Sequence, residues 1–462
     1  MSKFNSSQGF RKIEESLSQK RASVHFVGAG GISMYSLLVF TAERGISVSG
    51  SDRSESDRTK KLKARGFDVR VPENLEAVEG ASLIVYSLAV SENDRELRLA
   101  EEMGIPQVSR AEYLAYLSRE YKMKISVSGS HGKSTATAMI TRALSFCEMS
   151  PSAISGASLE LDGEPYLLGA RDYLVFEACE YKDSFLKFTP DISVFLNLEL
   201  DHTDYFKGLD DIKRSFLSAM GRAKICVVNK DDRELSTLAE STAVPTLTYA
   251  IDADADFKAV DLSSDGGFYS FSVLKSGEII GKITLSVLGK FSIYNALAAF
   301  AAAYTLGVPP HSIAAALSSF CGIERRIEFI GKRRCGAPVI YDYAHHPSEI
   351  RATIKAVREF YGGRLNVIFK AHTYTRTRDL FDGFVEALSL ADRVYLSEID
   401  AIREARVEGI DAAGLARAIG NGALALDDAE IISRLKNDDG AIIIMGAAPL
   451  EEIKEEILKN KI

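Results

Sequence analysis

Three stretches of this chain alternate short apolar runs with helical patterns, and this alternation restricts the fold more than any other feature. A strand, a helix and a second strand in succession build a parallel strand pair with the helix across one face of the sheet. The sequence therefore predicts an α/β protein with parallel sheets. Its 462 residues suggest about three domains at roughly 150 residues each.

The strand and helix patterns also place the domain boundaries. The first pattern gives strands at 24–27, 47–49, 69–71 and 83–86. The second opens with a strand at 124–128 and continues with strands at 173–176 and 192–196 and a buried helix at 296–304. The third has strands at 339–341, 365–369, 394–396 and 441–445, and a helix at 348–360. We expect a Rossmann-like domain over residues 1–119, a central domain over 120–331 and a second Rossmann-like domain over 332–462.

Charge and cysteine content exclude several classes of protein. The net charge of -8 lacks the positive footprint of a nucleic-acid surface, so we expect no nucleic-acid partner. The five cysteines show no C-x-x-C spacing, which argues against disulfides or a zinc site and favours a reducing cytosol. The chain lacks an export signal and any stretch long enough to span a bilayer. We expect a cytoplasmic protein without a membrane span, either a monomer or a dimer.

A glycine turn lies between the strand at 124–128 and the next helix. It reads Gly129, Ser130, His131, Gly132, Lys133, Ser134 and Thr135. Glycines let backbone N–H groups face phosphate oxygens, Lys133 can reach the terminal phosphates, and Ser134 can ligate magnesium. Val127 stands where the strict G-x-x-x-x-G-K-[ST] pattern has its first glycine, so a plain glycine-capped turn is the alternative. The placement between strand and helix favours an ATP site in a P-loop-type domain.

Two acidic elements follow neighbouring strands of the same domain. Glu177 and Glu180 come just after one strand, and the segment 197–204 comes just after the next. Because the carboxyl ends of parallel strands face one crevice, both elements should converge on the phosphate turn. Carboxylate, imidazole and hydroxyl groups suit a magnesium ion that also holds ATP, with manganese as the other candidate. We expect Ser134, Glu177 and His202 as metal ligands, although the second element alone would be read as a loop cap.

A second glycine-rich turn lies near the N-terminus. Gly28, Gly30 and Gly31 follow the first expected strand and precede a helix, a position where backbone N–H groups bind a pyrophosphate. Asp52 ends the next strand and is placed to meet a ribose. By itself this pattern indicates a dinucleotide site, although Ser33 replaces the third glycine of G-x-G-x-x-G.

In these motifs the chain resembles the Mur ligases, and the similarity covers nearly its whole length. The family motifs G-T-H-G-K-T-T, E-A-D-E and N-x-E-x-D-H-x-D are matched at residues 129–135, 177–180 and 197–204. The turn at 25–34 is similar to the family's H-F-I-G-I-G-G-x-G-M. Residues 342–347 look like D-Y-G-H-H-P, and residues 372–378 look like H-R-Y-T-R-T-R.

The resemblance implies an ATP-dependent carboxylate-amine ligase, closest to the branch that adds L-alanine. Such an enzyme joins L-alanine to the lactyl carboxylate of UDP-N-acetylmuramate through an acyl phosphate and releases ADP, in peptidoglycan precursor synthesis. The implied cofactors are ATP and Mg²⁺, and the implied small-molecule partners are UDP-N-acetylmuramate and L-alanine. The first domain would hold the UDP-sugar and the central domain ATP, with the third domain over ATP and the amino acid.

The resemblance also implies roles for individual residues. Catalytic roles fall to Lys133, Glu177, His202, Arg326 and His345. ATP contacts fall to the phosphate turn and to Asn295, Arg326 and Asp342. UDP-sugar contacts fall to Gly28, Gly30, Gly31, Ser51, Asp52 and Ser87. Amino-acid contacts fall to Tyr343, His345, His372 and Arg376, with His345 as the candidate acceptor of the amine proton.

Four positions depart from the family pattern. Cys179 replaces the acidic residue of E-A-D-E, Ala344 replaces a glycine, Thr373 replaces the arginine of H-R-Y, and residues 446–449 replace G-A-G followed by Asp or Asn. Thr373 matters most, because threonine cannot pair with a carboxylate bidentately. Two alternatives therefore stay open: a recycling ligase that adds a tripeptide to the same sugar nucleotide, and a nucleotide-binding protein without catalysis.

Overall fold

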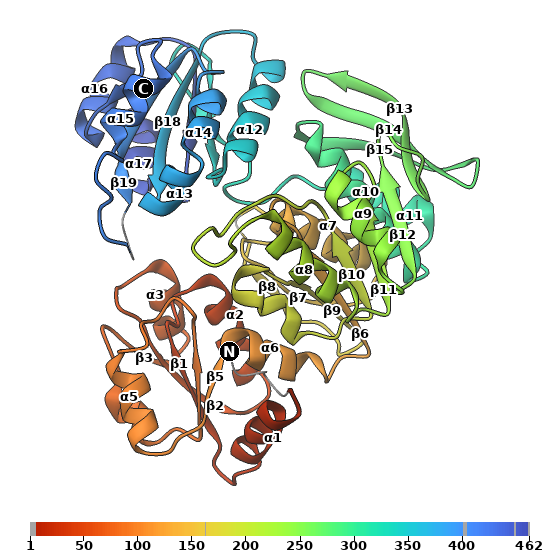
Figure 1. Ribbon diagram of the computed structural model, residues 1–462, viewed down its shortest axis with the longest axis vertical. Coiled ribbons are helices and arrows are strands. Elements are labelled where there is room, and N and C mark those ends of the chain that lie inside the picture. Colours follow the sequence, from red (N-terminus) through yellow and green to blue (C-terminus); the bar gives the residue numbers. More distant parts are fainter. Residues whose placement is uncertain (1–5, 162, 401–403, 448–449, 461–462) are drawn as a thin grey trace.

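Three separate sheets form the framework of the protein in its computed structural model (Figure 1). The structure describes residues 6–161, 163–400, 404–447 and 450–460. Helices flank each sheet, and most strand pairs are parallel, so the predicted α/β class with three domains is confirmed. Among the described residues, no helix is both long and apolar enough to cross a bilayer.

The N-terminal domain has a parallel sheet of five strands in the order β3-β2-β1-β4-β5. Its strands are β1 (Ser23–Val27), β2 (Ser47–Ser51), β3 (Asp68–Arg70), β4 (Leu83–Tyr86) and β5 (Gln107–Ser109). Its helices are α1 (Ser6–Leu17), α2 (Ile32–Ala42), α3 (Asp57–Ala64), α4 (Leu75–Glu79), α5 (Arg95–Glu102) and α6 (Arg110–Ser118). The strand order reverses beside β1, so a crevice opens at the carboxyl ends of β1 and β4.

The central domain has a sheet of ten strands in the order β15-β14-β13-β12-β11-β10-β6-β9-β7-β8. The strands that carry the predicted motifs are β6 (Met123–Ser128), β9 (Tyr173–Glu177) and β10 (Ile192–Phe195). The others are β7 (Ser152–Ile154), β8 (Tyr166–Leu167), β11 (Ile225–Asn229), β12 (Thr246–Ala250), β13 (Phe257–Asp265), β14 (Phe268–Lys275) and β15 (Glu278–Leu288). From β7 to β13 the strand pairs are parallel, and β14 and β15 extend the sheet in antiparallel fashion.

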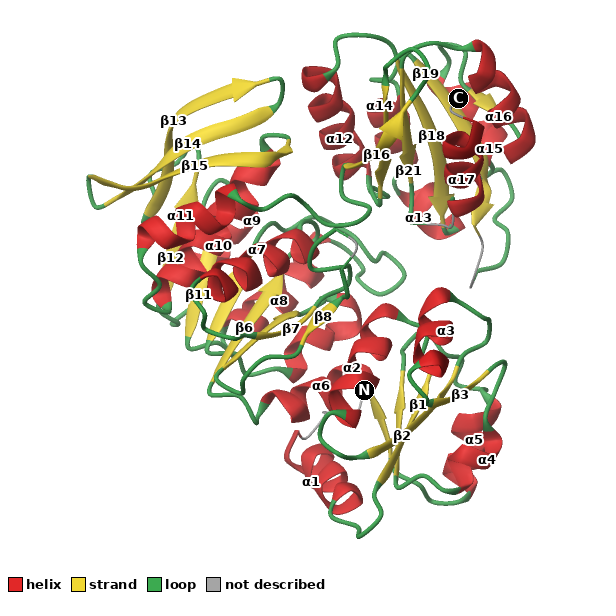
Figure 2. Ribbon diagram, turned by 180° about the vertical axis from the view of Figure 1, so that it is seen from behind, coloured by secondary structure: helices red, strands yellow, loops and turns green. Residues whose placement is uncertain are grey.

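Helices cover both faces of this central sheet (Figure 2). They are α7 (Lys133–Phe146), the 3₁₀ segment η1 (Tyr181–Lys187), α8 (Leu209–Met220), α9 (Arg233–Ser241), α10 (Phe291–Thr305) and α11 (Pro310–Ser318). The alanine-rich segment predicted as a buried helix lies within α10, which packs against α7 and is buried along most of its length. Alanine suits this position because a small side chain with high helix propensity lets the two helices approach closely.

The C-terminal domain has a sheet of six strands in the order β16-β17-β21-β18-β19-β20. Its strands are β16 (Glu328–Lys332), β17 (Pro338–Asp342), β18 (Leu365–His372), β19 (Arg393–Asp400), β20 (Leu424–Ala425) and β21 (Ala441–Met445). Its helices are α12 (Pro347–Phe360), α13 (Tyr374–Asp379), α14 (Phe381–Leu388), α15 (Ala412–Ile419), α16 (Asp428–Asn437) and α17 (Glu451–Asn460). Because β16 pairs with β17, the third sheet begins before residue 332.

The apolar cores divide differently from the sheets. One continuous core contains residues of the N-terminal domain, such as Phe40 and Leu114, together with Phe176 and Phe188 of the central domain. We call this contact, where α2 and α6 meet β8, β9 and η1, the N-terminal seam. The C-terminal domain instead has two cores of its own, on the two sides of its sheet. It lies apart from the N-terminal domain, with the central domain beside both (Figure 2).

Candidate active site

The phosphate turn joins β6 to α7, as the sequence predicts, and its glycines are required by the geometry. Gly132 has a φ of +81°, and a Cβ atom there would come within 2.6 Å of the Oδ1 atom of Asn295. A residue with a side chain would therefore be strained in its backbone and would clash. This close approach also brings Asn295, from α10, directly onto the turn.

The segment after β10 holds the turn in place. Asn197 Oδ1 accepts a hydrogen bond from the backbone N–H of His131 at 2.8 Å, and Asn197 Nδ2 donates to the His131 carbonyl oxygen at 3.1 Å. The backbone N–H of Glu199 donates to Ser130 Oγ at 2.9 Å. The predicted convergence of this element on the phosphate turn is therefore confirmed, and side-chain bonds, rather than proximity alone, fix the shape of the turn.

Lys133 begins α7 and is paired within the site. Its Nζ atom lies 2.5 Å from the carbonyl oxygen of Gly129 and 3.2 Å from Glu180 Oε2. Burial would raise the pKa of Glu180, but Lys133 and His202 outweigh it and lower that pKa to about 2. Glu180 was expected near the phosphate turn, but only Glu177 of the motif after β9 was predicted to have a catalytic role.

The expected metal ligands lie around this ion pair. Ser134 is buried in the first turn of α7. His202 Nε2 lies 3.6 Å from Glu180 Oε1, and ligand atoms of Cys179, Glu180 and His202 all lie within 4.8 Å of one another. Burial would lower the pKa of His202, but Cys179, Glu180 and Asp201 raise it to about 10. His202 is therefore a cation that must lose a proton before it can bind a metal.

Glu177, the third expected ligand, has its own partners. Its Oε1 atom accepts hydrogen bonds from Ser155 Oγ at 2.7 Å and from the backbone N–H of Gly156. The carboxylate beside His202 is thus Glu180 rather than Glu177. Hydroxyl, carboxylate and imidazole groups nevertheless make a donor set that fits Mg²⁺ at the end of a phosphate turn.

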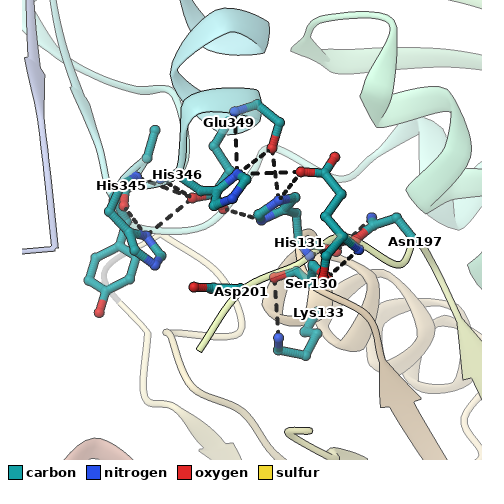
Figure 3. Close-up of polar contacts among 12 residues, drawn as sticks. Ser130, His131, Lys133, Asn197, Asp201, His345, His346 and Glu349 are labelled. Carbon is teal, nitrogen blue, oxygen red and sulfur yellow. Dashed lines mark hydrogen bonds and ion pairs between the residues drawn. The ribbon is translucent and has the colours of Figure 1, made fainter. Parts of the chain in front are cut away.

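A charge cluster joins the phosphate turn to the start of α12 (Figure 3). The His131 ring lies 4.8 Å from the His346 ring, and His131 Nε2 lies 2.9 Å from Ser348 Oγ and 3.3 Å from Glu199 Oε2. His131 Nδ1 lies 3.4 Å from Glu349 Oε1, which is close enough for an ion pair, but the two atoms do not form a hydrogen bond. Burial would lower the pKa of His131, but Glu349 and Glu199 raise it to about 9. His131 is therefore charged at neutral pH.

Further polar pairs connect the same two domains. Nε and Nη2 of Arg376, in α13, each lie 3.1 Å from Asp201 Oδ1. Burial would raise the pKa of Asp201, but Arg376 outweighs it and lowers that pKa. Thr203 Oγ1 donates to Asp379 Oδ2 at 2.6 Å. We call the contact formed by these pairs and the His131 cluster the C-terminal seam.

A cavity of about 370 Å³ lies at this seam. Its apolar wall includes Phe291, Tyr294, Phe320 and Ile323, and its polar wall includes Gly132, Asn295, Arg326, Asp342 and Glu349. Arg326 Nη1 donates to Glu349 Oε1 at 3.3 Å. Burial raises the pKa of Asp342 to about 6. A mainly apolar recess that ends at a phosphate turn is suited to a purine nucleotide.

The residues expected to hold the amino acid lie at or just after the carboxyl ends of β17 and β18. His345 follows β17, and its Nδ1 lies 3.1 Å from the Tyr343 carbonyl oxygen and 3.1 Å from Glu349 Oε2. His372 ends β18, with its Nδ1 3.8 Å from Asp400 Oδ2. Thr373 comes next with a φ of +72°, which is strained for a β-branched residue. Two of the residues that depart from the family pattern, Ala448 and Pro449, lie outside the described residues.

The second predicted site lies at the carboxyl ends of β1 and β4. The backbone N–H of Gly30 donates to Asp52 Oδ2 at 2.9 Å, and Arg58 Nε donates to the Gly30 carbonyl oxygen at 2.6 Å. Gly28 has a φ of +87° and approaches Ser87 closely. The Ser51 hydroxyl donates inward to Glu96 at 2.5 Å, so the side chain of Ser51 supports the domain interior rather than facing the crevice.

Comparison with known proteins identifies the family. Residues 23–122 match the Mur ligase family, catalytic domain; residues 127–303 match the Mur ligase middle domain; and residues 325–448 match the Mur ligase, glutamate ligase domain. The UDP-N-acetylmuramate--L-alanine ligase of Clostridium acetobutylicum is 36% identical, over 95% of this chain and 97% of that protein. The enzyme of the same name from Acetivibrio thermocellus is 38% identical, over 95% and 96%.

Solved structures share the fold. The UDP-N-acetylmuramate-alanine ligase MurC of Thermotoga maritima superimposes with a TM-score of 0.81 at 24% identity, over 95% of this chain and 98% of that one. A murein peptide ligase of Psychrobacter arcticus superimposes with a TM-score of 0.73 at 23% identity, over 95% and 98%. Three family domains in order, near-complete relatives and the phosphate turn at the centre agree, and the chain belongs to the Mur ligase family.

Proposed function

We propose that this protein joins L-alanine to the lactyl carboxylate of UDP-N-acetylmuramate and consumes ATP in doing so. The relatives at 36–38% identity over nearly the whole chain carry this activity in their names. The cavity between the phosphate turn and Arg326 supports ATP as the second substrate, because it combines an apolar wall with N–H groups and cations at one end. That cavity is the structural observation on which the proposal rests.

In the first step, a carboxylate oxygen of the sugar nucleotide attacks the γ-phosphorus of ATP. The bond from that phosphorus to the β,γ-bridging oxygen breaks, and ADP leaves with the electron pair. Lys133 and Arg326 would spread the negative charge that develops on the phosphoryl oxygens. Lys133 is held by Glu180 in this structure, so it must turn to the phosphates when ATP binds.

Ser134, Glu177 and His202 are our proposed ligands for Mg²⁺. Bound there, Mg²⁺ would neutralise phosphate charge during the transfer. Cys179 and Glu180 are the neighbouring side chains whose ligand atoms also lie close to His202. The thiol is a poor magnesium ligand, so we assign the ion to the oxygen donors and the imidazole.

In the second step, the amine nitrogen of L-alanine attacks the acyl carbon, and the bond from that carbon to the phosphate oxygen breaks. Inorganic phosphate leaves, and the amine gives up a proton. His345 is our candidate for the proton acceptor, with Tyr343, His372 and Arg376 as candidates for holding the amino acid. Glu349, beside His345 Nδ1, would stabilise the imidazolium that forms.

The test is phosphate release from ATP in the presence of Mg²⁺ and UDP-N-acetylmuramate. Free amino acids are added one at a time, and then a tripeptide. We expect turnover with L-alanine, and none for a Lys133→Ala variant with any amine. Turnover only with the tripeptide would favour the recycling reaction. This reaction is the second candidate because a strained threonine, Thr373, replaces the family arginine. Silence with every amine would overturn the ligase proposal.

A further inference from the structure

Arg110 is a cation that the motifs do not include. It begins α6 directly after β5, at the carboxyl edge of the N-terminal sheet. α6 presses against the central domain here: Glu112 Oε1 lies 3.4 Å from Lys187 Nζ, and Ala111 shares an apolar core with Ala178. Arg110 therefore lies in the N-terminal seam, opposite the segment that follows β9.

The charge of Arg110 has no protein partner within the described part of the chain. Its partly buried side chain makes neither a hydrogen bond nor an ion pair there. Burial lowers the pKa of Arg110, and the groups that oppose this shift are the Cys179 thiol and the Glu177 carboxylate. Glu177 ends β9 and Cys179 follows it, so both groups lie across the N-terminal seam from α6.

The other cations of the site differ from Arg110 in this respect. Lys133 is paired with Glu180, Arg326 with Glu349, and Arg376 with Asp201. A partly buried guanidinium that forms no ion pair is stabilised when a ligand supplies a carboxylate. The arrangement therefore indicates an anionic ligand group at the seam.

We propose that Arg110 binds the carboxylate of the acceptor substrate, which under the proposed function is the lactyl carboxylate of UDP-N-acetylmuramate. The nucleotide end belongs at the glycine turn after β1, and the γ-phosphate belongs at the turn after β6. The reacting carboxylate must lie between these two turns. Arg110 follows Ser109, which pairs with Tyr86 of β4 beside the end of β1, and its neighbour Ala111 packs in one core with Ala178 after β9. A planar guanidinium holds a carboxylate with two parallel hydrogen bonds and so fixes which oxygen points at the phosphorus.

The proposal predicts that Arg110 distinguishes two sugar nucleotides that differ by the lactyl group. UDP-N-acetylglucosamine has the same uridine, pyrophosphate and acetamido sugar as UDP-N-acetylmuramate but lacks the lactyl carboxylate. We would titrate both ligands into the full-length protein without ATP by isothermal titration calorimetry. The variants are Arg110→Ala and Arg110→Lys, with Arg119→Ala as a control at the other end of the same helix, where Arg119 forms an exposed pair with Glu14.

For Arg110→Ala we expect the Kd for UDP-N-acetylmuramate to rise about 10- to 100-fold, the usual weight of a charged hydrogen-bonded pair. The Kd for UDP-N-acetylglucosamine should change less than about 2-fold. Arg110→Lys should recover part of the loss, because it keeps the charge without the fork. Arg119→Ala should match the wild type with both ligands.

An equal loss for both ligands, or no loss for either, would overturn the assignment of Arg110. A far-UV circular dichroism spectrum and a thermal melt establish that each variant is folded, and Arg110→Gln replaces the alanine variant if that one is not. Failure of the wild type to bind UDP-N-acetylmuramate at all would instead overturn the proposed function, so the two failures are distinguishable.

Discussion

The two seams of this protein hold neighbouring domains together by different means. At the N-terminal seam, residues of both domains form one apolar core, and Phe40 and Tyr35 of α2 contact the Tyr166 ring of β8. At the C-terminal seam the contacts are polar, with Arg376 on Asp201 and His131 among Glu199, Ser348 and Glu349. The same two domains also share one aromatic pair, Phe360 with Phe268. Dry apolar contacts resist separation, whereas ion pairs exchange readily for water.

This difference teaches where the enzyme can move. The N-terminal seam fixes the distance between the glycine turn after β1 and the phosphate turn after β6. Under the proposed function, the C-terminal seam would open to admit ATP and close to exclude water from the acyl phosphate. A reaction with a hydrolysable intermediate needs a fixed distance between its two substrates and a site that closes. The N-terminal seam provides the first and the C-terminal seam the second.

The largest expected effect tests whether the N-terminal seam is structural. Phe40 is 1% exposed, and its ring lies 6.2 Å from the Tyr166 ring at the N-terminal seam. Phe360 is 36% exposed, and its ring lies 5.9 Å from the Phe268 ring, between the C-terminal and central domains. Phe40→Ala should reduce the free energy of unfolding by about 3–5 kcal/mol because it leaves a buried cavity. Phe360→Ala should cost less than about 1 kcal/mol. Urea denaturation measures both, and equal losses would abolish the contrast.

The next effect is a pH dependence confined to the C-terminal seam. The pKa of His131 is raised to about 9 in the closed contact, above its ordinary value of about 6.5. Its charge therefore stabilises the seam fully below pH of about 6.5, and this stabilisation is lost as the pH rises through 9. The raised pKa of His131 corresponds to about 3 kcal/mol.

Small-angle X-ray scattering of the substrate-free protein checks this dependence. The radius of gyration should increase between pH 7 and 10 as the C-terminal domain separates. His131→Gln removes the titrating group and should flatten the curve. A pH response that survives in His131→Gln would mean that another group controls the seam.

The smallest expected effect concerns the Arg376 pair. Arg376→Gln should lower kcat/KM by about 10- to 100-fold, because Asp201 then loses its partner and the closed seam is less populated. The free energy of unfolding should change by less than about 1 kcal/mol, since an opened seam returns Asp201 to water. Thr203→Val removes one neighbouring bond and serves as the milder comparison. A large loss of stability in Arg376→Gln would place this pair in a rigid core instead.

Local elements of the fold were predictable from the sequence. The strand predicted at 83–86 coincides with β4, and the helix predicted at 348–360 begins one residue earlier, where Pro347 and the His346 cap start α12. The sequence of residues 251–281 is typical of strands and turns, and the structure pairs β13, β14 and β15 there as an antiparallel arm. Its pairing depends on which strand edge is free, and no local pattern records that.

The candidate site was predictable where one sheet brings motifs together and not where domains meet. The segment 197–204 was expected at the phosphate turn because both follow parallel strands. Arg376 and Asp201 belong to different domains, and no periodicity encodes their contact. Arg110 gave no signal either, since an arginine in the first turn of a helix ordinarily points into water. Which predicted residues contact ATP, metal and substrates stays a prediction.

The two separate cores of the C-terminal domain have a consequence for how such enzymes diversify. A unit that carries its whole core, and touches its neighbour mainly through polar pairs, can be replaced as one piece while exposing little apolar surface. The other two domains share a core and cannot be divided in this way. Recombination at the linker before Arg325 would therefore exchange the domain that is proposed to hold the amine substrate, while the other two domains are inherited together.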